Sequence, residues 1–160
     1  QSLEAAGISY NQTLKAFYED DTEQGSGAKR PSNPPIENSG VFLTTGETPI
    51  EKYSDSLWNS CADEEIEVAL IVISRIGGEG FDLPRNMKNK AGTGAVDGAN
   101  ADDHYLQLDN NERALVKKVC SLENIKHVIV LINSSAAFEL GFLDDAGHSL
   151  TIKKSTAHYG

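Results

Sequence analysis

The sequence predicts an α/β domain built on a mainly parallel sheet, and three features of its 160 residues indicate this fold. Two continuous apolar runs, residues 67–74 and His127 to Asn133, are rich in β-branched residues, as is typical of strands buried on both faces. Between them, Asp109 to Glu112 has the pattern of a helix cap. Strand, loop, helix and strand in this order form a βαβ unit, with parallel strands and a right-handed crossover.

Composition limits the classes of function. The net charge of -10 disfavours nucleic acid and anionic membrane surfaces as partners, because both attract clustered Lys and Arg. No apolar run approaches the roughly 20 residues that span a bilayer. Cys61 and Cys120 form neither a disulfide framework nor a metal-binding spacing, so we expect no metal and no cofactor. With no signal segment in the chain, the two free cysteines favour the cytoplasm over secretion.

The segment before residue 67 is predicted to be mainly helical. Apolar side chains recur every three or four residues from Leu3 to Tyr18, which predicts one helix with a single apolar stripe. Residues 20–35 are rich in Gly, Ser, Pro and charge, and this composition indicates an exposed connection. A second helix is predicted to begin at Thr48 to Glu51, where Thr caps, Pro takes the first helical position and Glu reaches back to the cap.

The second half of the chain contains a long loop and a helix with one buried face. Residues 83–103 exceed the usual loop length, which indicates a loop over a site. The helix after Asp109 is predicted to bury Leu115, Val116, Val119 and Cys120. Residues 146–160 show no convincing periodicity and are predicted to be a tail, which leaves residues 1–145 as the domain.

Glu79 is the first candidate for chemistry, because it follows the first buried strand within a glycine-rich turn. In open α/β sheets, ligands bind at the carboxyl ends of the strands, and Asn133 to Ser135 fall at the same edge. Gly77, Gly78 and Gly80 allow a ligand to approach the backbone closely. A phosphate cradle is excluded by the anion at its centre and by the missing motif. Proton transfer by a carboxylic acid is the more natural role, and a solvated loop carboxylate is the alternative.

The run Val72 to Asp82, reading VISRIGGEGFD, resembles the "isoleucine-serine-arginine … glycine-glutamate-glycine-x-aspartate" segment in the second domain of family 3 glycoside hydrolases. The helix start at 106–112, the strand and turn over 128–135 and 139–144, and the opening residues 3–14 resemble the same domain. Together these matches cover most of residues 1–145.

This resemblance implies a layered α/β sandwich that is incomplete relative to the family domain. It assigns the general acid/base role of a retaining, β-glucosidase-like enzyme to Glu79. Asp82 and Arg75 are further site candidates, for substrate binding or for orienting the groups that bind it. For Asp82, a simple turn residue is the alternative. The nucleophilic Asp of the family lies in a separate barrel that this chain lacks, so the resemblance implies a fragment that acts on carbohydrate only within a larger enzyme.

Two other readings stay open. An incomplete sheet has unpaired edges, which favours a non-catalytic binding module or a homo-oligomer that pairs through them. A small hydrolase of different specificity is the third reading. The remaining polar residues are weaker candidates, because His104, His127, His148 and His158 lack a metal-binding spacing, and Ser134 and Ser135 are expected to cap a helix.

Overall fold

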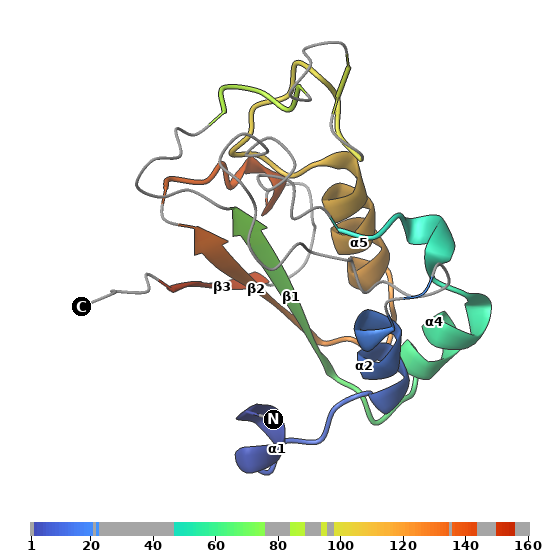
Figure 1. Cartoon of the computed structure of the whole chain (residues 1–160). Helices are drawn as coiled ribbons and strands as arrows, with labels where there is room; N and C mark the ends of the chain where they lie inside the picture. The colour runs from blue at the N-terminus through green and yellow to red at the C-terminus, as the bar shows by residue number, and fades with distance from the viewer. Residues whose placement is uncertain are drawn as a thin grey trace.

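The computed structural model describes residues 2–20, 22, 47–75, 84–88, 94–95, 98–134, 136–143 and 150–155. Its helical elements are α1 (Ser2–Ala5), α2 (Gln12–Glu19), the 3-10 turn η2 (Ile50–Lys52), α4 (Asp55–Cys61), α5 (Asn110–Cys120) and the 3-10 turn η3 (Gly141–Leu143). Its strands are β1 (Val68–Arg75), β2 (His127–Ser134) and β3 (Leu150–Ser155). Figure 1 shows α2, α4 and α5 together on one side of β1 and β2.

The sheet contains the predicted parallel pair. β1 and β2 run parallel over their whole length, from Val68 opposite His127 to Arg75 opposite Ser134. α5 lies between them in the chain, so the expected strand–helix–strand unit is present. The prediction of an α/β fold with a parallel sheet is therefore confirmed, and the strand order is β1-β2-β3.

The third strand lies where the sequence predicts a tail. Within residues 146–160, Leu150–Ser155 forms β3 and pairs in parallel with β2, from Leu150 beside Val128 to Ser155 beside Asn133. This stretch includes Lys153 and Lys154, so it does not read as a buried strand. Charged residues, Lys above all, are common on edge strands, and β3 lies at the end of the strand order. The sequence pattern of residues 146–160 therefore did not predict this strand.

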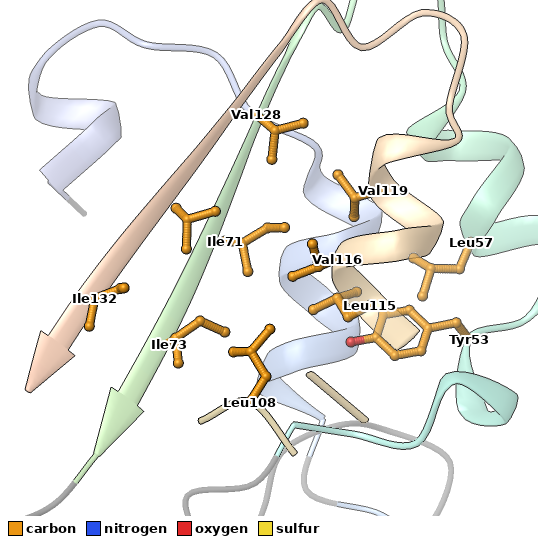
Figure 2. Packing of buried hydrophobic residues seen from close by; sticks show 11 residues of the cluster. Tyr53, Leu57, Ile71, Ile73, Leu108, Leu115, Val116, Val119, Val128 and Ile132 are labelled. Atoms are coloured by element: carbon orange, nitrogen blue, oxygen red, sulfur yellow. The ribbon is translucent and has the colours of Figure 1, made fainter. Parts of the chain in front are cut away.

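The core lies between the sheet and the helices. Alternate side chains of β1 and β2 point toward α5 and α4, as Figure 2 shows. Ile73 and Val130 are almost fully buried, with 1% and 0% of their surface exposed. The buried cluster consists of Tyr53, Leu57, Ile71, Ile73, Leu108, Leu115, Val116, Val119, Val128, Val130 and Ile132.

Replacement of Ile73 by Val tests how tightly this core is packed. Loss of one buried methyl group from a close-packed site should lower the free energy of unfolding by about 0.5–1.5 kcal/mol. The matched control is Ile8→Val, because Ile8 is 53% exposed and should change stability little. Urea unfolding of both variants measures the difference, and equal midpoints would mean that Ile73 does not belong to a packed core.

The first helix is interrupted, which contradicts the prediction of one helix from Leu3 to Tyr18. α1 ends at Ala5, and Gly7 takes a left-handed backbone with φ of 70°. α2 then starts anew after Asn11, whose side-chain oxygen accepts a hydrogen bond from the Leu14 amide at 2.9 Å. The spacing of apolar residues does not reveal the break, because the positive φ at Gly7 and the cap at Asn11 cause it.

The helix start predicted at Thr48 to Glu51 is also displaced. Only the single turn η2 follows Pro49, and no side chain caps it. α4 begins after Ser54, whose hydroxyl oxygen accepts a hydrogen bond from the Leu57 amide at 3.2 Å. Ser54 therefore caps this helix, whereas the sequence predicts Thr48 as the cap. Leu57 of α4 is nevertheless buried in the core, and Ile50 of η2 packs against the cluster.

α5 forms as predicted. The Asp109 carboxylate accepts a hydrogen bond from the Glu112 amide at 2.7 Å, and the Asp109 amide donates to the Glu112 carboxylate at 2.8 Å. This reciprocal capping box satisfies two amides that a helix start leaves without a partner. Leu115, Val116 and Val119 are buried as expected, whereas Cys120 is only partly buried.

Candidate functional site

The carboxyl edge of the sheet is where the sequence predicts a site. β1 and β2 end side by side, with Arg75 opposite Ser134. Glu79 and Asp82 lie outside the residues that the structure describes, so their roles stay predictions. Arg75 stands four positions before Glu79 and is described. The described part of this edge therefore centres on Arg75.

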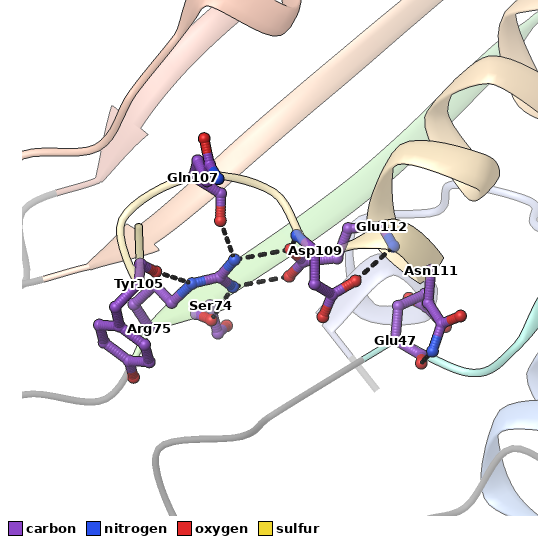
Figure 3. Close-up of polar contacts among 8 residues, drawn as sticks. All are labelled: Glu47, Ser74, Arg75, Tyr105, Gln107, Asp109, Asn111 and Glu112. Carbon is purple, nitrogen blue, oxygen red and sulfur yellow. Dashed lines mark hydrogen bonds and ion pairs between the residues drawn. The ribbon is translucent and has the colours of Figure 1, made fainter. Parts of the chain in front are cut away.

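Arg75 uses all five of its guanidinium N–H groups within the chain, as Figure 3 shows. Its Nε donates to the Tyr105 carbonyl at 2.8 Å, and Nη1 donates to the Ser74 carbonyl at 2.9 Å. Nη1 and Nη2 each donate to one oxygen of the Glu112 carboxylate, both at 2.6 Å. Nη2 also donates to the Gln107 carbonyl at 2.5 Å. The guanidinium is therefore saturated.

The surroundings of Arg75 remove it from water. The side chains of Arg75 and Glu112 are 4% and 2% exposed. The guanidinium carbon lies 5.7 Å from the ring centre of Tyr105 and 5.1 Å from that of Phe138, within the range of cation–π attraction. The buried ion pair thus joins the end of β1 to the first turn of α5, and the contact with Phe138 joins it to the chain after β2.

The ion pair keeps Arg75 charged. Burial alone would lower its pKa, but the hydrogen bonds and charge of Glu112 outweigh burial, so the pKa of Arg75 is raised. A bidentate arginine–carboxylate pair of this kind fixes geometry as well as charge. We call the group of Arg75, Glu112 and Asp109, with the carbonyls of Ser74, Tyr105 and Gln107, the Arg75 cluster.

The geometry limits the role that the sequence suggests for Arg75. It leaves no guanidinium N–H free to bind a substrate, so direct substrate binding by Arg75 is not supported. Arg75 instead holds the end of β1 in place. The sequence around Arg75, an arginine at the end of an apolar run, does not identify Glu112 as its partner. The capping pattern identifies Glu112 only as a residue at the start of a helix.

Asp109 is the unusual acid of the Arg75 cluster. It is 5% exposed, and burial together with the nearby negative charge of Glu112 raises its pKa to about 6. The hydrogen bond from the Glu112 amide and the charge of Arg75 oppose this rise only in part. Asp109 therefore takes up a proton in the folded chain at a pH where it would be ionised in the unfolded chain.

This raised pKa predicts that stability falls as pH rises. The folded state binds the Asp109 proton more tightly, so its advantage is complete below the unfolded pKa of about 3.9 and is lost as pH passes about 6. Asp109→Asn keeps a capping oxygen but cannot titrate. Between pH 4 and pH 7, wild type should lose about 2–3 kcal/mol of unfolding free energy relative to this variant. Urea unfolding at several pH values measures the difference, and a constant or opposite difference would contradict it.

A second polar cluster joins α2 to η2, and the Glu47 carbonyl accepts a hydrogen bond from the Asn111 side chain of α5 at 3.1 Å. The hydroxyls of Tyr18 and Tyr53 are 2.6 Å apart, and that of Tyr53 donates to the Glu47 carboxylate at 2.9 Å. Burial and the charge of Glu47 raise the pKa of both tyrosines, so both stay neutral donors at physiological pH. The Glu47 carboxylate also accepts from the Thr48 amide at 2.7 Å. We interpret this cluster as structural, because each group has a partner within the chain.

The described parts of residues 83–103 are folded onto the domain. Met87 is 4% exposed, and its amide donates to the Asp103 carbonyl at 3.0 Å. Gly98 has φ of 78°, and its carbonyl accepts from the Asn110 amide at 2.8 Å. These contacts bring the segment to the first turn of α5, next to the Arg75 cluster. The prediction of a loop over a site concerns this same edge and stays a prediction.

Two weaker candidates have ordinary roles in the structure. His104 Nδ1 lies 3.1 Å from the Glu139 carboxylate, and both side chains are exposed. The Ser134 hydroxyl accepts from the Ala136 amide at 3.2 Å, so Ser134 caps a turn rather than the predicted helix. Within the described residues, no three His, Cys, Asp or Glu side chains are placed to hold a metal ion.

Comparisons with known proteins identify no relative. No protein-family model, curated protein or solved structure matches the chain. Among the helices that the structure describes, none is long and apolar enough to cross a membrane. The resemblance to family 3 glycoside hydrolases therefore depends on the short motifs alone.

Proposed function

We propose that the chain is part of a β-glucosidase-like family 3 glycoside hydrolase and forms the incomplete α/β sandwich domain that carries the acid/base loop. In this proposal Glu79 is the general acid/base and Asp82 orients it or the substrate. The substrate is a β-glucoside-like carbohydrate, and the chain alone is not a competent glycosidase.

The observation that carries the proposal is the anchored end of β1. A proton-transferring residue must be held at a defined distance from the bond that it protonates. Arg75 is buried, its five N–H groups are all bonded, and β1 pairs with β2 up to this residue. A loop that leaves this end begins from a fixed point, as an acid-bearing loop requires.

The chemistry of a retaining glycosidase assigns Glu79 two successive steps. It first donates its proton to the leaving oxygen while a second carboxylate bonds to the anomeric carbon. It then takes a proton from the water that displaces this second carboxylate. The two carboxyl groups lie about 5–5.5 Å apart in such enzymes, and the resemblance assigns the second one to an Asp of the barrel domain.

The coding sequence around the chain tests the proposal at once. We expect an upstream segment that encodes a barrel, and an open reading frame that begins near Gln1 would contradict the proposal. In an assay with an aryl β-glucoside, the isolated chain should show no turnover, and the polypeptide with the barrel should be active.

A second candidate function, assembly through a sheet edge, is favoured by the position of β1. It pairs only with β2 among the described residues, which leaves its other edge unpaired over eight apolar-rich positions. Such an edge binds another strand readily. The assembly hypothesis predicts a dimer or larger species in light scattering, and a clean monomer at high concentration would count against it.

A further inference from the structure

We draw no further inference here: the strongest candidate, the exposed apolar patch that Val68, Leu70 and Val72 form on the face of β1 turned away from α5, carries none because nothing in the structure shows what covers it.

Discussion

Glu112→Gln is expected to lower the free energy of unfolding by about 3–5 kcal/mol, because it leaves the buried charge of Arg75 without its counter-ion. The Glu112 side chain is 2% exposed and makes both charged contacts to Arg75. It also accepts the hydrogen bond from the Asp109 amide. Urea unfolding followed by circular dichroism measures the loss. The matched control is Glu123→Gln, since Glu123 is exposed and this change should have little effect.

A double substitution distinguishes the cost of leaving Arg75 without its counter-ion from a general sensitivity of this site to substitution. Replacement of a buried ion pair by apolar residues is often close to neutral, because it removes both desolvation costs. The double variant Arg75→Met with Glu112→Met should therefore be more stable than Glu112→Gln. If Glu112→Gln lowered the free energy of unfolding by less than about 1 kcal/mol, the pair would contribute no more than a surface salt bridge. Arg75 and Glu112 would then not anchor the end of β1.

Glu79→Gln should lower turnover of a β-glucoside by about 100- to 10,000-fold, in the polypeptide that joins the chain to a barrel domain. The amide cannot donate a proton to the leaving oxygen. The loss in the first step should be greatest for alkyl glucosides, whose leaving groups need the proton, and small for aryl glucosides with acidic phenols. Steady-state rates over a series of leaving groups measure this dependence.

The control for Glu79→Gln is Glu51→Gln, which changes an exposed carboxylate in η2. This variant should retain the wild-type rates with every leaving group. If Glu79→Gln were equally active, Glu79 would be a solvated loop carboxylate. If it lost the same factor with all substrates, its role would be positioning rather than proton transfer.

The sequence predicted the parts of the fold that local patterns determine. The apolar runs identified β1 and β2, and the capping box at Asp109 and Glu112 identified the start of α5. Each signal lies within a few neighbouring residues, so no information from the rest of the chain was needed.

Features that depend on distant contacts were missed. The edge position of β3 follows from pairing with β2. The break at Gly7 is local, but it depends on a positive φ that the spacing of apolar residues does not reveal. The partner of Arg75 lies 37 positions along the chain, and the tyrosine pair with Glu47 joins segments 29 to 35 positions apart. The spacing of apolar residues along the sequence contains no information about such contacts.

The sequence predicts a candidate site at the carboxyl edge of the sheet, and the structure adds how that edge is supported. The rule that ligands bind at the carboxyl ends of strands pointed to the edge where β1 and β2 end. This rule does not predict that all five guanidinium N–H groups of Arg75 are bonded within the chain. Those bonds make Arg75 an anchor for the end of β1 rather than a ligand-binding residue.

The measurement that tests the role of Glu79 most directly is turnover of an activated aryl β-glucoside by the Glu79→Gln enzyme with added azide. Azide needs no general base to attack the glycosyl-enzyme, so it should relieve the slow second step. Our account predicts faster turnover and a glucosyl azide product of retained β configuration. No acceleration, or a product of inverted configuration, would contradict it.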